Sequence, residues 1–324
     1  MYNISQKYFS RLVFFAKILI IAGAYYVISE KILDNGHINT HLLSDQFSAF
    51  EFLAYPFILL LLLLSLANWV LEILKWQSLV QFVKPISFSK ATSQSLSSLT
   101  ASLMTPNRIG EYGAKAIYYR KSESAKIMLL NFLGNFTQMG VTMFFGSFGL
   151  LLLWEYLPSF SLLSSTLIWY GVALILLVAG TVLLKKKWEA WYATLKNKFL
   201  KIPYKIYSRT GIYSIMRYLV FSHQFYFFLL FFGVDIQYST AMPIIFSMYF
   251  ISSVIPGFVI FDWLVKGSVA IYLFGLFDVN EIIVLSITSL MWILNFAIPS
   301  IVGMIFVLTF DGSSLKLKQS EVLE

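Results

Sequence analysis

The sequence predicts an all-α polytopic membrane protein with six full transmembrane helices and two opposed re-entrant helical hairpins, arranged as an inverted repeat. Of the 324 residues, 58% are hydrophobic and only 12% are charged, and the mean hydropathy is +0.75. A water-soluble globule cannot bury that much apolar surface, and disordered chains have the opposite composition. The 31 Phe, 19 Tyr and 8 Trp fit a lipid-embedded body with aromatic residues at both interfaces.

Six stretches meet the length of about 20 apolar residues that a transmembrane helix needs. They are 12–29, 52–73, 127–154, 166–184, 212–233 and 282–309. The first contains Lys17, which can extend to the headgroups from its position near the start of the span. No small-residue cleavage site follows this span and a second one comes soon after, so we expect it to be retained rather than removed as a signal peptide.

The distribution of Lys and Arg predicts the orientation. Residues 1–17 contain 3 of them, 75–126 contain 8, 185–217 contain 9 and the tail contains 2, so that 22 of the 24 fall in alternate loops. By the positive-inside rule both termini face the cytoplasm. We therefore expect one membrane domain over residues 1–310, followed by a cytoplasmic tail.

The finer organisation follows from the same spans. The pseudo-repeats cover about 12–154 and 166–309, and the tail covers 311–324. A short helix in the cytoplasmic interface is also expected, where apolar residues recur at helical spacing after three lysines, and we interpret it as an anchor. Its apolar residues are Trp188, Trp191, Tyr192, Leu195 and Phe199.

Residues 87–121 do not have the pattern of a simple span. Ten Ser or Thr lie between Ser87 and Thr105, and proline and glycine interrupt the stretch. Because the flanking spans place both ends in the cytoplasm, we expect a hairpin that enters the membrane from inside, with helices over about 89–104 and 106–120. Unpaired backbone groups at its tip would each cost several kcal/mol in lipid, so the tip must be buried in protein or line a wet cavity.

The start of the second helix is a predicted anion site. Thr105 offers a hydroxyl cap and Pro106 a first helical residue that has no N–H to lose. The free N–H groups and the positive dipole end attract anions, and Arg108, Glu111 and Lys115 share one helical face. The candidate headgroup-binding residues here are Thr105, Asn107, Arg108, Glu111 and Lys115. The alternative is that the three charged residues pair only with one another and hold the shape of the hairpin.

A second break lies within residues 238–277, at the sequence S-S-V-I-P-G over 252–257. Asp262 follows five residues after Gly257, and Lys266 four residues after that, which is the favourable order for an ion pair on a helix. We expect a hairpin that enters from outside. The candidate binding residues in it are Ser252, Ser253, Asp262 and Lys266.

Two simple spans over 239–260 and 264–277 would also leave the C-terminus inside. The second would have only about 14 residues, which is short for a span, so the hairpin is the preferred interpretation. Each break has proline, then an acid five or six residues on, then lysine four residues after the acid. Two spans, a hairpin and one span in each half are typical of inverted-topology repeats, whose binding site lies where the repeats meet.

The motif T-P-N-R-I-G-E at 105–111 resembles the T-P-[GN]-R-[IL]-G-E motif of the lysylphosphatidylglycerol synthase transmembrane region family, which is also called flippase-like. The resemblance covers essentially the whole chain, including the span count and the Ser-rich stretch before the motif. The second motif of the family, P-x-x-x-G-G-x-G-x-R-E, is degenerate here and is replaced by Pro256, Gly257, Phe258, Asp262 and Lys266. This departure bears on the substrate more than on the fold.

The resemblance implies a lipid-translocating domain of a bacterial or archaeal cytoplasmic membrane, without the soluble aminoacyl transferase that some relatives carry. The expected function is a flippase for a phosphate-bearing headgroup, anionic or polyprenyl-linked, and not an enzyme. No G-x-x-x-x-G-K-[ST] motif is present, so uphill transport would use an ion gradient or the membrane potential. The expected partner is a membrane phospholipid or lipid carrier, with no nucleic acid.

Two other functions stay open. The chain could be a non-transporting partner subunit of a cell-envelope synthase; the possible protein partners are a second copy of the chain, in a homodimer, or an envelope-synthesis protein. It could also be an integral-membrane lipid-modifying enzyme, although its only candidate acids and bases are Glu111, Asp262 and His223, and no paired-carboxylate motif or nucleophile elbow is present.

The remaining signals are weaker. The chain has no Cys, which excludes disulfides, thiolate metal sites and Cys nucleophiles. His37 and His41 have a zinc-compatible spacing, but a solvated loop is the favoured interpretation, and no metal or cofactor is expected. His223 is expected to be a satisfied core histidine. A row of amides in the third span either joins helices or lines a headgroup path; its members are Asn131, Asn135 and Gln138.

Overall fold

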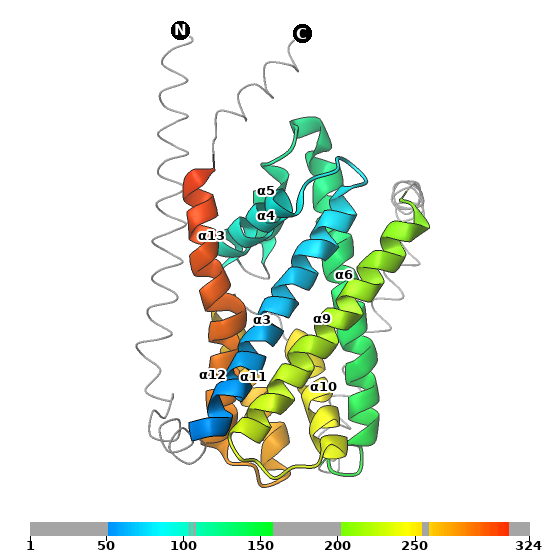
Figure 1. The fold of residues 1–324 in the computed structure, drawn as a ribbon. Helices are drawn as coiled ribbons and strands as arrows, with labels where there is room; N and C mark the ends of the chain where they lie inside the picture. Colours follow the sequence, from blue (N-terminus) through cyan, green and yellow to red (C-terminus); the bar gives the residue numbers. More distant parts are fainter. Residues whose placement is uncertain (1–50, 104, 106–107, 158–201, 255–258, 311–324) are drawn as a thin grey trace, which may run out of the picture.

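The computed structural model describes residues 51–103, 105, 108–157, 202–254 and 259–310. These residues form an all-helical structure without strands (Figure 1), as the sequence predicts. The expected spans 12–29 and 166–184, the interfacial helix near Trp188 and the tail lie outside the described residues.

The long helices are α3 (Glu51–Val80), α6 (Lys121–Leu152) and α9 (Tyr204–Phe231), and the last is a composite of α12 (Glu281–Trp292), the π-helix η1 (Ile293–Ala297) and α13 (Ile298–Thr309). In the described part of the chain, two helices are long and apolar enough to cross a membrane, namely Tyr55–Val80 and Glu281–Thr309. The 32-residue α6 and the 28-residue α9 are as long, but polar side chains interrupt their apolar surface.

Two pairs of shorter helices lie in opposite halves of the bundle. The pair α4 (Phe88–Ser102) and α5 (Ile109–Ala116) lies at the end where α3 and α13 finish, and α10 (Tyr238–Val254) and α11 (Val259–Gly275) lie in the other half (Figure 1). The helices within each pair pack on each other. α10 and α11 have 17 residues each, which is less than the roughly 20 that a simple span needs.

The Ser-rich helix α4 is buried in protein, as the sequence predicts for the first hairpin. Its hydroxyls bond to the preceding turn, as Ser98 Oγ does with Ser95 O at 2.9 Å, or to a neighbouring helix, as Thr100 Oγ1 does with Ser300 O at 2.9 Å. A Cβ on Gly303 of α13 would collide with Thr100 and with the backbone of α4. The close approach of these two helices therefore depends on a residue without a side chain.

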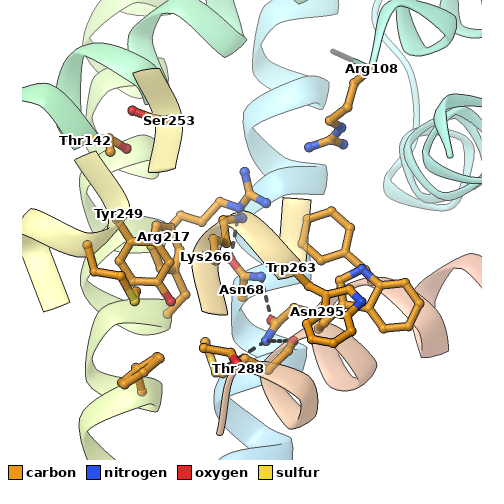
Figure 2. A pocket seen from close by; sticks show the side chains of 16 residues that line it. Asn68, Arg108, Thr142, Arg217, Tyr249, Ser253, Trp263, Lys266, Thr288 and Asn295 are labelled. Atoms are coloured by element: carbon orange, nitrogen blue, oxygen red, sulfur yellow. Dashed lines mark hydrogen bonds between the residues drawn. The ribbon is translucent and has the colours of Figure 1, made fainter. Parts of the chain in front are cut away.

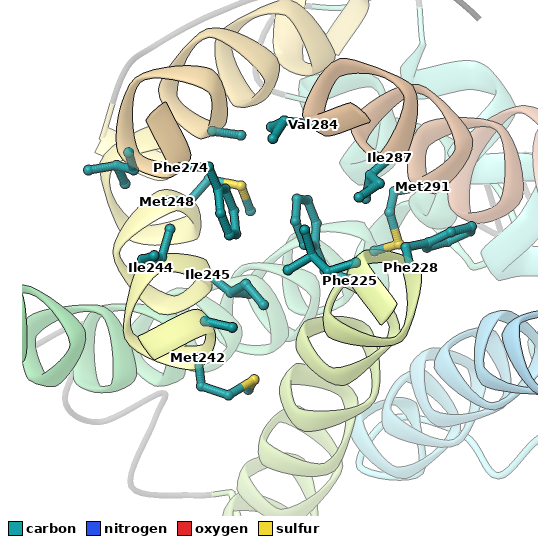
Figure 3. Packing of buried hydrophobic residues seen from close by; sticks show 14 of the residues in the cluster. Phe225, Phe228, Met242, Ile244, Ile245, Met248, Phe274, Val284, Ile287 and Met291 are labelled. Atoms are coloured by element: carbon teal, nitrogen blue, oxygen red, sulfur yellow. The ribbon is translucent and has the colours of Figure 1, made fainter. Parts of the chain in front are cut away.

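The largest apolar core joins α9 to α12 in the half that contains α10 and α11 (Figure 3). Its labelled members are Phe225, Phe228, Met242, Ile244, Ile245, Met248, Phe274, Val284, Ile287 and Met291. α10 also packs on α6, where Gly146 and Gly149 leave no room for a Cβ against Phe250 and the carbonyl of Pro243. Small residues at a helix contact let two backbones approach closely.

Candidate functional site

The turn between α4 and α5 presents Arg108 in a strained conformation. Arg108 is the N-cap of α5 and has φ 58° and ψ 28°, in the left-handed region that non-glycine residues rarely adopt. α5 therefore begins at Ile109, three residues later than the predicted start at Pro106. Strain of this kind persists where the surroundings impose it, and it concentrates at functional sites.

Thr105 holds this turn instead of capping the first helical residue. Its Oγ1 accepts a hydrogen bond from the N–H of Gly110 at 2.8 Å and donates one to Ser102 O at 2.9 Å. A Cβ on Gly110 would lie 2.8 Å from Ala101 O, so a glycine is needed where α5 leaves the turn against α4. Thr105 and Gly110 of the motif thus fix the start of α5 against α4, next to Arg108.

Glu111 is the centre of the first charged cluster, as the sequence predicts. Its Oε1 lies 2.7 Å from Lys115 Nζ, and its Oε2 lies 3.1 Å from an Nη of Arg108. Lys115 Nζ also donates to Asn131 Oδ1 at 2.8 Å and lies 4.3 Å from the centre of the Trp76 ring. Glu111 and Lys115 are buried, whereas the Arg108 side chain is 30% exposed, so Arg108 is the member that a ligand can reach.

A second charged cluster, between α3 and α9, was not predicted. Glu72 Oε2 lies 2.7 Å from Lys75 Nζ and 2.6 Å from Arg217 Nη1. Arg217 Nε also donates to Asn68 Oδ1 at 2.9 Å. Glu72 and Lys75 are buried, and the Arg217 side chain is only 14% exposed. The signal in the sequence was an acid and a base three residues apart at the end of a predicted span.

A chain of amides continues from Arg217 into the π-helix. Asn68 Nδ2 donates to Asn295 Oδ1 at 2.9 Å, and Asn295 Nδ2 donates to Gln224 Oε1 at 2.9 Å. Gln224 Nε2 in turn donates to Leu61 O at 2.9 Å. This chain of hydrogen bonds links α3, α9 and η1. It also fixes the side-chain oxygen of Asn68, which accepts the hydrogen bond from the Arg217 guanidinium. Such π-helical turns occur frequently at functional sites.

The π-helix also supplies backbone acceptors that an α-helix would use internally. Ser65 Oγ donates to Leu294 O at 2.8 Å, and Trp69 Nε1 donates to Asn295 O at 3.0 Å. Both donors come from α3. The wider turn is thus fixed by side chains of a neighbouring helix, as an interrupted hydrogen-bond ladder requires.

A cavity of about 250 Å³ lies between these groups, and three cations from three elements line it: Arg108, Arg217 and Lys266 (Figure 2). Arg108 and Lys266 lie over the same ring, with Cζ and Nζ at 5.9 and 5.6 Å from the centre of Phe296. No carboxylate is among the described residues that line the cavity. Its other lining residues are Asn68, Thr142, Phe221, Phe225, Met248, Tyr249, Ser253, Trp263, Thr288, Met291, Trp292, Asn295 and Phe296.

The cavity brings together part of the predicted site. Of the candidate residues, Arg108, Ser253 and Lys266 line it. Glu111 and Lys115 stand behind Arg108, Thr105 holds the turn, and Ser252 is buried with its hydroxyl on Met248 O. Asn107 and the side chain of Asp262 lie outside the described residues, as do His37 and His41.

The amides of α6 make contacts away from the cavity. Asn131 accepts from Lys115, Asn135 Nδ2 lies 3.4 Å from Tyr112 OH, and Gln138 Nε2 donates to Ser214 O at 3.3 Å. These contacts join α6 to α5 and α9. Of the two interpretations of these amides, they agree with the one in which the amides join helices. Both ring nitrogens of His223 have partners, Leu219 O and Tyr238 OH, but the side chain is only partly buried and is not a core histidine.

The site can bind an anion with mixed polar and apolar surroundings. Two guanidinium groups are each oriented by an acid, which leaves their other donors for a ligand, and aromatic rings line the rest of the cavity. Within the described ranges no group of three or more His, Asp or Glu is placed to hold a metal ion. Comparison of the chain with protein-family models, curated proteins and solved structures finds no match.

Proposed function

We propose that the protein translocates a lipid with a phosphate-bearing headgroup across a bacterial or archaeal cytoplasmic membrane, without hydrolysing ATP and without acting as an enzyme. The observation that carries this proposal is the cavity that Arg108, Arg217 and Lys266 line together. In this proposal six helices span the membrane, both termini are cytoplasmic, and the hairpins α4–α5 and α10–α11 enter from opposite faces.

The cations favour a phosphate as the bound group. Guanidinium presents a planar fork of donors that matches phosphate oxygens, and the acids beside Arg108 and Arg217 hold both forks in place. Since no acid lines the described part of the cavity, a cationic ligand would meet three like charges there. An anionic headgroup is the ligand that suits this lining.

The apolar surroundings favour a lipid as the molecule that carries the phosphate. Large apolar side chains are exposed along the outer faces of the helices, as they are in proteins embedded in lipid. On α6 they include Phe132, Phe136, Phe144, Phe148 and Leu151. Aromatic and Met side chains also line the cavity, which suits the apolar part of a lipid next to its headgroup.

The test is lipid translocation in proteoliposomes. Lipids with a fluorophore on the acyl chain are reconstituted with the protein, and a membrane-impermeant reductant is added outside. We expect the inner-leaflet fluorescence to be lost quickly with wild-type protein. Arg108→Ala and Arg217→Ala should each slow this loss at least about tenfold, since a charge-assisted contact contributes about 1.5–3 kcal/mol.

The matched control is Arg209→Ala, because Arg209 is an exposed arginine of the same helix as Arg217. It should translocate at the wild-type rate. Wild-type rates for the folded Arg108→Ala and Arg217→Ala variants would overturn the proposal. Binding of phosphate-bearing lipid without translocation would instead favour the partner subunit of an envelope synthase.

A further inference from the structure

We propose that the cavity selects a dianionic phosphate group, a phosphomonoester or a pyrophosphate, over the monoanionic phosphodiester of an ordinary phospholipid. This inference rests on the proposed function for the source of the ligand, because it names the headgroup class of the same site. Its basis is the balance of charge around the cavity and the number of donors left open there.

The two charged clusters and Lys266 carry an excess of positive charge. The cations are Arg108, Lys115, Lys75, Arg217 and Lys266, and the carboxylates that pair with them are Glu72 and Glu111. The side chain of Asp262 lies outside the described residues, but its spacing from Lys266 predicts a further pair. Even with Asp262 counted, five cations face three carboxylates, an excess of two positive charges.

Part of this positive charge lies where water is scarce. Lys75 and Lys115 are almost fully buried, at 2% and 1% exposure, and each already has an acid within 2.7 Å. Positive charge that the protein does not balance is costly in such surroundings, so a ligand that balances it binds more tightly. A dianion matches the excess of two, whereas a phosphodiester leaves one positive charge without a counterpart.

Hydrogen-bond donors at the cavity that have no acceptor favour a phosphate group with more terminal oxygens. Arg108 Nε and Trp292 Nε1 are buried and make no hydrogen bond within the described part of the chain. Both residues line the cavity. A phosphomonoester presents three terminal oxygens to such donors, and a phosphodiester presents two. Donor count and charge balance therefore point to the same ligand class.

The test compares two probes that differ by one methyl ester. Hexyl phosphate and methyl hexyl phosphate are titrated into the detergent-solubilised full chain, and the affinities are measured by calorimetry. At pH 7 we expect the monoester to bind at least about tenfold more tightly, as expected for a second charge held by charge-assisted hydrogen bonds. Equal affinities at pH 7 would overturn the inference.

Lowering the pH protonates the phosphomonoester and so tests whether its second negative charge causes the preference. The second pKa of a phosphomonoester is about 6, so at pH 5 hexyl phosphate is mostly a monoanion. In the site, Arg108 faces Glu111 and Arg217 faces Glu72 in ion pairs at 3.1 and 2.6 Å. The affinity for the monoester should fall toward that for the diester, which should change little. A preference that persists at pH 5 would contradict the inference.

Single substitutions test whether the cavity cations produce the preference. Arg217→Gln and Lys266→Gln should each reduce the monoester preference several-fold, and Arg209→Gln should keep it. Two variants on different helices, each checked for a cooperative thermal transition, separate loss of the charge from loss of the fold. An unchanged preference in both folded variants would assign the selectivity to other groups and overturn the inference.

A third arm identifies the source of the phosphate. Inorganic phosphate should bind more weakly than hexyl phosphate, because it leaves the aromatic lining of the cavity unused; equal binding would indicate a soluble anion and overturn the headgroup assignment. If phosphodiester lipids are translocated but the monoester preference is absent, this inference fails and the proposed function stands. If no phosphorylated probe binds the folded protein, both fail.

Discussion

Arg217 Nη1 of α9 lies 2.6 Å from Glu72 Oε2 of α3, so an ion pair joins two long helices at the wall of the cavity. The same Glu72 oxygen lies 2.7 Å from Lys75 Nζ. One buried carboxylate thus pairs with two cations, and it orients the guanidinium that faces the ligand space. Because Glu72 has two cationic partners, its loss has a larger expected effect than the loss of an exposed acid.

Glu72→Gln should destabilise the protein by about 3–5 kcal/mol, the usual cost of leaving a buried charge without its partner. The measurement is the midpoint of thermal unfolding in detergent. The control is Glu155→Gln, which removes an exposed carboxylate after α6 and should shift the midpoint little. Similar midpoints for the two variants would mean that Glu72 does not balance Lys75 and Arg217.

Asn295→Leu should weaken both stability and headgroup binding. The Asn295 side chain bonds to Asn68, Gln224 and Ser65 of other helices, and each such contact contributes about 0.6 kcal/mol between helices in a membrane. We expect a loss of about 2 kcal/mol in stability, and weaker binding because Asn68 no longer fixes Arg217. Asn135→Leu removes one 3.4 Å contact and is the control. Unchanged binding in Asn295→Leu would refute a positioning role for the amide chain.

The sequence predicted the packed helix pair α4 and α5 and the cluster around Glu111, because both depend on local spacing. Breaks at Pro106 and a polar run before it mark the turn, and residues three and four apart on a helix meet. The start of α5 was predicted too early because it depends on the left-handed backbone of Arg108, which no propensity assigns to an arginine.

Arg217 was missed for a different reason. In the sequence it is the sixth residue of the predicted span 212–233, but it is also the last of the nine cations of 185–217 that were predicted to be cytoplasmic, so no partner within the membrane was expected for it. α9 begins at Tyr204, eight residues before the predicted span, which moves Arg217 from the start of the helix to its middle, beside Glu72. The partner is 145 residues away in sequence, and only tertiary packing brings the two together. The π-helix around Asn295 is likewise set by donors from α3.

Gly303→Ala and Gly140→Ala form a matched pair that tests the contact of α13 with α4. A Cβ on Gly303 would collide with Leu96 O and Thr100, whereas one on Gly140 of α6 would meet nothing within 4 Å. Gly140→Ala should be neutral or raise stability by up to about 1 kcal/mol through helix propensity. Gly303→Ala should lower the unfolding midpoint, because α13 must move away from α4. A midpoint for Gly303→Ala at or above wild type would show that the contact tolerates a methyl group.

Arg108→Lys should bind headgroup phosphate as poorly as Arg108→Ala. A point charge cannot reproduce the two-donor fork of guanidinium, even where it keeps the ion pair with Glu111. Arg108→Gly relieves the left-handed strain and should unfold at a temperature no lower than Arg108→Ala. Binding and translocation of each variant are measured together with the unfolding midpoint. If Arg108→Lys translocated lipid at the wild-type rate, only the positive charge at this position would be required, and not the guanidinium fork.

The last prediction separates the two roles of Lys266, which lines the cavity and stands four residues after Asp262. Asp262→Asn alone should lower expression or stability, since Lys266 would lose the ion-pair partner that the spacing of four residues predicts. Lys266→Met alone should do the same and also weaken phosphate binding. In the double variant stability should recover, because neither charge is left alone, but binding should not, because the cavity still lacks its third cation. The measurements are the unfolding midpoint and the affinity for hexyl phosphate.

If the double variant recovered both stability and binding, the pair would be purely structural. If the single variants behaved like wild type, the two residues would face water.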